Sequence, residues 1–256
     1  MPLIAPAEAA AATRRRASFN GSGFWHSTFL GANRYRPDAA PPPVPGRPYA
    51  VAFLVEQDPD STVAAHFHQA DQFQVLTGGS GTLGTHAARP VTVHFAAAFS
   101  AYGPVRAGAA GLTYFTLRNG WDPGARTMPA ARGDLPRPRR HRELVSQPLA
   151  PHGPASAAGT AILAPAADGL GAWHYRLPAG AAPAGPDPAG GAGQYWLVLA
   201  GALDLGAARL GPRSCVFVGP EEMAPATRAG PQGASVLALQ FPRAPERDAG
   251  AGNPVA

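Results

Sequence analysis

The sequence predicts an all-β protein that contains two copies of one domain. Its 256 residues include 31 Gly and 30 Pro, and both residue types interrupt long helices. Short apolar stretches are separated by Gly- or Pro-containing turns about every ten residues, which is typical of sandwiches and barrels. The hydrophobic content of 45% is sufficient for a sizeable core.

An internal repeat indicates the duplication. Gly79 and Gly201 lie 122 residues apart, and the same ungapped shift superposes eleven identical residues between positions 72 and 117. The matching positions are Gln72 with Gln194, Gly79 with Gly201, Leu83-Gly84 with Leu205-Gly206, Pro90 with Pro212, Phe95 with Phe217, Arg106-Ala107-Gly108 with Arg228-Ala229-Gly230, Gly111 with Gly233 and Leu117 with Leu239.

The repeat divides the chain into predicted segments. We expect an N-terminal extension over 1–47, a first barrel over 48–118, an Arg- and Pro-rich connector over 119–171, a second barrel over 172–242 and a tail over 243–256. The first 20 or so residues are rich in Ala, which predicts a frayed end. Residues 24–30 predict a strand against the first barrel, and the Pro-rich segment 39–45 predicts an extended loop. Further strands are expected at 49–55, 91–95, 112–117 and 172–177.

The composition argues against several classes of protein. All 21 basic residues are Arg, a bias that indicates a GC-rich bacterial genome, and the formal net charge is only +5. The Arg clusters at 14–16 and 137–142 lack interleaved aromatic residues, so we expect no nucleic-acid partner. No apolar run approaches the roughly 18 residues of a membrane span. The single Cys215 cannot form an intramolecular disulfide, and the sequence predicts a cytoplasmic protein with no membrane partner.

The stretch between Val63 and Gly79 carries the clearest chemical pattern. It places two histidines one residue apart and a carboxamide four residues later. Because residues i and i+2 of a strand share a face, His66 and His68 are expected to project into the same space. The apolar run that follows predicts the next strand, whose first inward side chain, Gln72, converges on them. The pattern predicts a small metal site inside a barrel.

This stretch resembles motif 1 of the cupin superfamily, Gly-x5-His-x-His-x3-4-Glu-x6-Gly. His66, His68 and Gly79 stand at the family's spacing, Gln72 replaces the Glu, and Asp60 replaces the first Gly. Together with the repeat, the chain is similar to the two-domain cupins, or bicupins, over residues 48–118 and 172–242. The resemblance implies a pair of double-stranded β-helix (jelly-roll) barrels, each with a pocket inside it.

The resemblance implies a divalent metal ion, such as Fe, Mn, Ni or Zn, as cofactor. The predicted ligands are His66, His68 and Gln72, with His94 as a substitute for the histidine of motif 2. That motif is nearly absent here, since Pro104 matches its Pro but Ala109 stands in its His position. In the second copy Pro188 and Gly190 occupy the positions of His66 and His68, so a metal is expected only in the first barrel.

Three further residues, Gln74, Tyr102 and Tyr114, are candidates for orienting a small-molecule ligand by hydrogen bonds. The sequence contains no phosphate-binding loop, so no nucleotide cofactor is expected. Three functions stay open at this point. The first is a metal-dependent oxygenase or isomerase that acts on a small organic anion. The second is a metal-free protein that binds or senses a small molecule, and the third is a structural bicupin that forms a homodimer.

Overall fold

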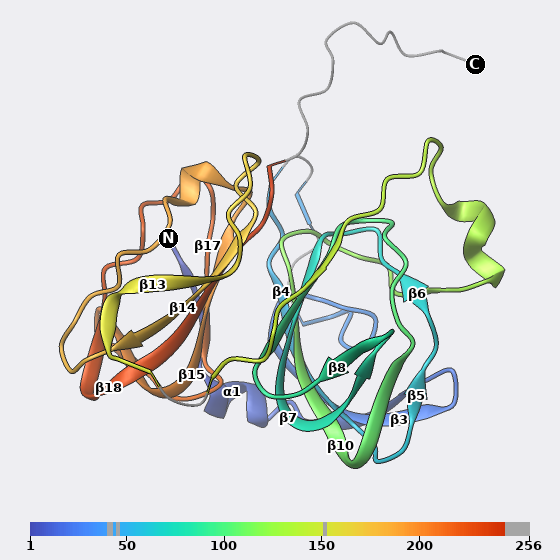
Figure 1. Ribbon diagram of the computed structural model, residues 1–256, viewed down its shortest axis with the longest axis horizontal. Coiled ribbons are helices and arrows are strands. Elements are labelled where there is room, and N and C mark those ends of the chain that lie inside the picture. Colours follow the sequence, from blue (N-terminus) through green and yellow to red (C-terminus); the bar gives the residue numbers. More distant parts are fainter. Residues whose placement is uncertain (40–42, 45–46, 151–152, 244–256) are drawn as a thin grey trace, which may run out of the picture.

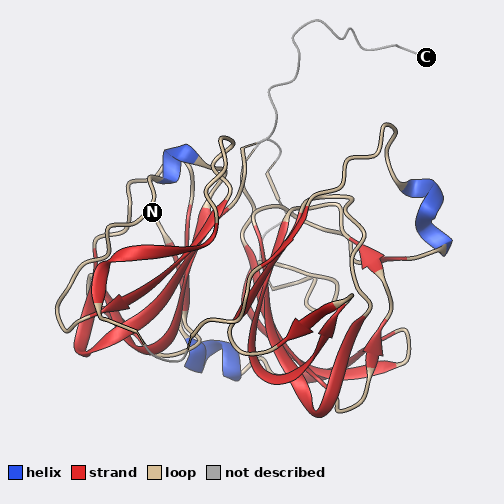
Figure 2. Ribbon diagram, viewed as in Figure 1, coloured by secondary structure: helices blue, strands red, loops and turns tan. Residues whose placement is uncertain are grey.

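The computed structural model describes residues 1–39, 43–44, 47–150 and 153–243. Two β-barrels stand side by side, and strands dominate both of them (Figures 1 and 2). This architecture confirms the predicted all-β fold of paired jelly-roll barrels. The predicted tail beyond Arg243 and part of the predicted loop over 39–45 lie outside the described residues.

A nine-stranded antiparallel sheet forms the first barrel, in the order β12-β9-β7-β10-β4-β3-β2, with β5 paired to β10 and β8 to β7. A small separate sheet pairs β6 with β11. The strands span β2 (Arg15–Phe19), β3 (Ser22–Leu30), β4 (Val51–Gln57), β5 (Thr62–Val63), β6 (His66–Phe67), β7 (Gln72–Leu83), β8 (His86–Ala88), β9 (Thr92–Ala96), β10 (Val105–Arg118), β11 (Arg126–Thr127) and β12 (Glu143–Val145).

The second barrel is a seven-stranded sheet in the order β1-β17-β15-β18-β14-β13, with β16 paired to β15. Its strands span β1 (Leu3–Ala5), β13 (Ser156–Leu163), β14 (Gly171–Leu177), β15 (Gln194–Leu205), β16 (Ala208–Leu210), β17 (Cys215–Val218) and β18 (Thr227–Gln240). The described residues also form three short helices, α1 (Ala7–Ala11), η1 (Ala130–Asp134) and η2 (Pro188–Gly190).

The sequence repeat corresponds to a structural repeat. Strands β7, β8 and β10 return as β15, β16 and β18, each shifted by the same 122 residues. Gly79 and Gly201 take the same left-handed backbone conformation, with φ of 71° and 69°. At each of them a Cβ would collide with a backbone carbonyl oxygen, that of Gly111 or Gly233, so only glycine fits at positions 79 and 201.

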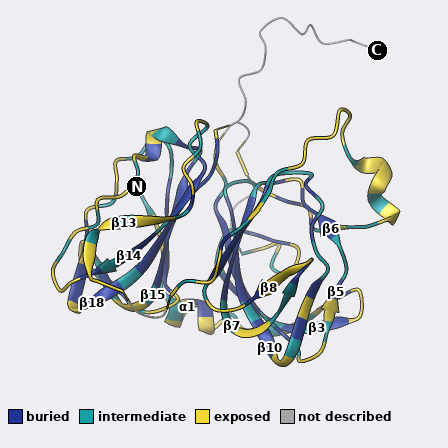
Figure 3. Ribbon diagram, in the orientation of Figure 1, coloured by how far each residue is buried: buried dark blue, intermediate teal, exposed yellow. Residues whose placement is uncertain are grey.

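The two barrels pack against each other, and strands at their interface are therefore buried on both faces. Along β7, Gln72 and Gln74 face the inside of the barrel, whereas Phe73 and Val75 join a core shared with the second barrel. The rings of Phe73 and Phe241 lie 4.9 Å apart across this interface. Figure 3 shows the buried strands of both barrels meeting in the middle of the molecule.

Two predicted segments differ from the structure. The N-terminal residues expected to fray instead form β1, which pairs with β17 of the second barrel, and β2, which pairs with β3 of the first. The predicted connector also supplies strands: β11 pairs with β6, β12 pairs with β9 of the first barrel, and β13 pairs with β14 of the second. Backbone pairing, which composition does not report, orders both segments. Among the described residues, no helix has the length and apolarity to cross a membrane.

Candidate functional site

A small cavity lies inside the first barrel, between the two-histidine segment and the strands β4, β7 and β10. The space open to the centres of water-sized atoms is about 70 Å³, room for several waters or one small organic molecule. Aromatic rings form much of its wall, and polar side chains gather at one side. The lining includes Phe19, Phe24, Tyr35, Phe53, Tyr114, His66, His68, Gln72, Gln74, Tyr102, Thr116, Arg118 and Asp122.

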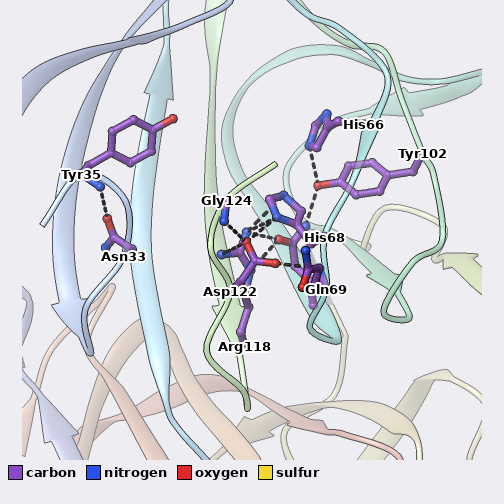
Figure 4. Close-up of polar contacts among 10 residues, drawn as sticks. Asn33, Tyr35, His66, His68, Gln69, Tyr102, Arg118, Asp122 and Gly124 are labelled. Atoms are coloured by element: carbon purple, nitrogen blue, oxygen red, sulfur yellow. Dashed lines mark hydrogen bonds and ion pairs between the residues drawn. The ribbon is translucent and has the colours of Figure 1, made fainter. Parts of the chain in front are cut away.

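His66 and Tyr102 are joined by a hydrogen bond among the polar residues of the cavity lining. Nδ1 of His66 donates to the carbonyl oxygen of Ala64 at 2.7 Å, which leaves Nε2 as the acceptor. The Tyr102 hydroxyl donates to that Nε2 at 2.9 Å (Figure 4). It accepts from Nε2 of Gln72 at 2.6 Å. The lone pair that His66 would offer to a metal is therefore engaged by Tyr102.

Arg118, the last residue of β10, projects into the same cluster because it lies directly opposite Gln72 in the β7–β10 register. Its Nε and Nη2 donate to Oε1 of Gln72 at 3.0 and 2.7 Å. Nη2 also lies 3.1 Å from both ring nitrogens of His68. The buried guanidinium thus contacts two of the residues predicted to bind a metal, His68 and Gln72.

Asp122 completes the cluster from the loop that follows β10. Its Oδ1 accepts from His68 Nδ1 at 2.9 Å and from the amide of Gly124 at 2.8 Å, and its Oδ2 accepts from the amide of Gln69 at 2.7 Å. Nη1 of Arg118 lies 3.4 Å from Oδ1, so the carboxylate balances the charge of the guanidinium. Because His68 donates a hydrogen bond to Asp122 through Nδ1, its Nε2 is free to accept a hydrogen bond from Nη2 of Arg118.

Burial sets the charges of these groups. Burial lowers the pKa of His66 to about 4 and, together with the charge of Arg118, the pKa of His68 to about 3. Burial alone would raise the pKa of Asp122, but the hydrogen bond from His68 and the charge of Arg118 outweigh it and hold that pKa well below its usual range. At neutral pH the cluster therefore contains two neutral imidazoles and one ion pair.

The donor set does not fit a divalent metal ion. A metal ligand needs a free lone pair. The lone pair of His66 accepts a hydrogen bond from Tyr102, and that of His68 accepts one from Arg118. Oε1 of Gln72 accepts two hydrogen bonds from Arg118. A guanidinium cannot lose its proton in a protein, so a nearby cation would also meet its positive charge. Within the described ranges, no three His, Cys, Asp or Glu side chains are grouped to hold a metal.

The remaining predicted site residues lie at different depths. Gln74, Tyr102 and Tyr114 line the cavity, and Gln74 shares the inner face of β7 with Gln72. His94 lies behind Gln74 and outside the cavity lining, with Nδ1 2.9 Å from Oε1 of Gln74 and Nε2 3.2 Å from Oε1 of Glu143. Protein oxygens thus occupy both of its ring nitrogens, and the structure does not bring it together with His66 and His68.

The second barrel is filled where the first is hollow. The 122-residue shift places Trp196 on Gln74, and the Trp196 ring packs 5.5 Å from that of Tyr175 inside the barrel. Gln240 takes the place of Arg118 and accepts from Nε2 of Gln194 at 3.1 Å, where Gln194 corresponds to Gln72. The turn of η2 replaces the two-histidine strand. The first barrel alone therefore carries the candidate site.

Sequence reasoning missed Arg118 and Asp122. A signal for Arg118 is present, since Tyr114, Thr116 and Arg118 alternate with apolar residues and so share the inner face of β10. Asp122 gives no comparable signal, because it belongs to a loop that the sequence assigns to the connector. Its role depends on the fold of that loop, which returns the carboxylate to His68.

Comparisons with solved structures agree with this architecture. The chain is similar to the Escherichia coli pirin YhhW in complex with nickel(II), with a TM-score of 0.53 and 13% identity, over 94% of this chain and 99% of that one. It is also similar to AerE from Microcystis aeruginosa, with a TM-score of 0.52 and 12% identity over 93% and 97% of the two chains. A variant of Bacillus subtilis oxalate decarboxylase gives a TM-score of 0.53 and 9% identity over 94% and 77%.

No protein-family model and no curated protein sequence matches the chain. The structural matches extend across both barrels at identities of 9–13%, so they bear on the fold. The repeat, the paired jelly-roll barrels and the cavity inside the first barrel lead to the same assignment. The chain has the two-domain fold of the cupin superfamily.

Proposed function

We propose that the first barrel binds a small organic molecule without the help of a metal ion, and that the second barrel is its structural support. The observation that carries this proposal is the position of Arg118, whose guanidinium donates to Gln72 and His68 in the place that the sequence pattern reserves for a metal. The positive charge in this pocket therefore comes from the Arg118 side chain and not from a metal ion.

The chemistry of the cavity wall supports an oxygen-bearing ligand. The hydroxyl groups of Tyr114 and Thr116 and the amide of Gln74 line the space and are hydrogen-bond donors. Burial raises the pKa of Tyr114, so its hydroxyl keeps its proton. Aromatic rings also line the space, among them Phe24 and Phe53, and Phe53 lies directly across from Thr116 in the β4–β10 register. A compact, planar molecule with a carbonyl or carboxylate oxygen fits a lining that combines aromatic rings with hydrogen-bond donors.

The charges of the lining residues favour an anion or a neutral acceptor over a cation. Arg118 and Asp122 compensate each other, whereas Arg34 adds one positive charge at the exposed edge of the cavity. His66 and His68 are neutral because burial lowers the pKa of each well below 7. These features support small organic anions and amides as ligand classes.

The second barrel supplies the variant that tests the proposal. Gln74→Trp copies the Trp196 plug into the first barrel, so it is expected to fill the cavity and abolish binding. Calorimetric titration with benzoate and benzamide, in excess EDTA, measures binding to wild type and variant. We expect saturable binding to the wild type that EDTA does not change, and at least a tenfold loss in Gln74→Trp.

Gln147→Trp is the matched control, because it introduces the same ring at an exposed position and is expected to leave binding unchanged. Circular dichroism and the melting temperature establish that each variant is folded. Binding that disappears on removal of metal, or that persists in a folded Gln74→Trp variant, would contradict the proposal.

A further inference from the structure

The cavity of the first barrel opens toward a second, outer pocket. Three residues, Asn33, Arg34 and Asp122, line both spaces and so form the doorway between them. The outer pocket is bordered by Pro37, Pro43 and the exposed ring of Trp121. A group bound at these three side chains would therefore border both spaces.

Asn33 presents a buried donor with a fixed orientation. Its Oδ1 accepts from the backbone amides of Tyr35 at 2.9 Å and Arg36 at 3.2 Å, so the carbonyl end of the amide is turned toward the backbone (Figure 4). Its Nδ2 is buried and has no hydrogen-bond partner among the described residues. A buried donor without an acceptor costs free energy, which an acceptor atom of a ligand would recover.

Arg34, the next residue in the chain, lines the same two spaces as Asn33 and carries a guanidinium. Its Cζ lies 5.2 Å from the centre of the Phe19 ring and 5.4 Å from that of Tyr35, which holds the side chain across the cavity edge. In the described part of the chain, Arg34 forms no ion pair with a carboxylate. Asp122 is the one acidic group at the doorway, and both of its oxygens already accept from His68, Gln69 and Gly124.

We infer that Asn33 and Arg34 form a carboxylate-binding subsite at the doorway. A carboxylate accepts the orphan N–H of Asn33 with one oxygen and the guanidinium of Arg34 with the other, and Arg is the side chain best suited to that planar group. The body of the ligand lies inward, among the aromatic rings of the lining and Tyr114. The ligand class is thus a small carboxylic acid with a compact, ring-sized body, an inference that rests on the proposed function of the cavity.

Benzoate and benzamide form a matched pair of probes, because they share a shape and differ in the carboxylate. Calorimetric titration of the wild type at low salt is expected to give at least tenfold tighter binding of benzoate. Arg34→Gln is expected to weaken benzoate about tenfold and to leave benzamide within twofold. Arg36→Gln, which removes the same charge two residues away, is expected to leave both unchanged.

Asn33→Asp tests the second contact without disturbing the turn. The substitution keeps the oxygen that accepts from Tyr35 and Arg36 but replaces the N–H donor by a carboxylate oxygen, so benzoate is expected to lose at least tenfold in affinity. Equal binding of benzoate and benzamide, or benzoate binding that Arg34→Gln does not change, would overturn the subsite and leave the proposed function standing. Binding of neither probe to the wild type would overturn both.

Discussion

Replacing Arg118 by Gln tests whether the guanidinium is an integral part of the first barrel. The second barrel contains the natural counterpart of this change, since Gln240 stands in the place of Arg118 and bonds to Gln194 at 3.1 Å. In Arg118→Gln the new side chain is expected to form the same amide–amide hydrogen bond with Gln72. Asp122, however, stays buried with its negative charge unbalanced.

The unpaired carboxylate of Asp122 determines how much free energy of unfolding Arg118→Gln loses. Removal of one partner from a buried ion pair costs about 3–5 kcal/mol. Asp122 keeps its bonds from His68, Gln69 and Gly124, and its separation from Arg118 is 3.4 Å, so we expect the lower end, about 3 kcal/mol. In Arg118→Gln/Asp122→Asn the charge is absent from both positions, and the two substitutions are expected to couple favourably by about 2 kcal/mol.

Urea unfolding followed by circular dichroism measures these free energies in wild type, both single variants and the double variant. Arg16→Gln is the control, because Arg16 and Asp58 form an exposed ion pair at 2.7 Å, and solvent screening makes the loss of such a pair far less costly than the loss of a buried one. If Arg118→Gln unfolds with the same free energy as Arg16→Gln, the guanidinium does not hold the cluster together and the reasoning fails.

Two predictions concern pH. His66 and His68 have folded pKa values of about 4 and about 3, below the unfolded value near 6.5, so the unfolded chain binds more protons and stability falls as the pH drops from about 6.5 to 4. Each histidine contributes roughly 1.4 kcal/mol per pH unit in that window, and urea unfolding of His66→Asn and His68→Asn is expected to show shallower slopes than the wild type. Asp122 has a lowered pKa, so its stabilisation is present above the unfolded pKa near 3.9 and is lost below it. Below about pH 4, wild-type stability is expected to fall more steeply than that of Asp122→Asn, and equal slopes would contradict the assignment.

Much of the fold is contained in local sequence patterns. The 122-residue repeat predicts two barrels, and the glycines at 79 and 201 do occupy matching bends with positive φ. The alternation of Gln72-Phe73-Gln74-Val75 predicts which side chains face the cavity. The role of the N-terminal residues is not predictable in this way, because β1 pairs with β17, more than two hundred positions away, and nothing local encodes that contact.

The candidate site was predictable in its location more than in its chemistry. His66, His68 and Gln72 converge as the spacing predicts. The spacing cannot reveal that hydrogen-bond donors of the protein itself occupy the lone pairs of these three side chains. That depends on Arg118, whose reach follows from the β7–β10 register, and on Asp122, whose loop closes onto His68. The doorway residues Asn33 and Arg34 lie in a loop without periodic pattern, and only the folded structure brings them to the cavity.

The most direct test of a pocket with an arginine in place of a metal is a titration of the purified wild type with Co²⁺, beside Arg118→Ala. We expect no saturable binding to the wild type. Arg118→Ala frees the lone pairs of His68 and Gln72, so it is expected to bind about one Co²⁺ per chain, and His68→Asn in that background is expected to abolish the binding. One equivalent of Co²⁺ bound by the wild type, and lost on replacement of His66 or His68, would contradict the account.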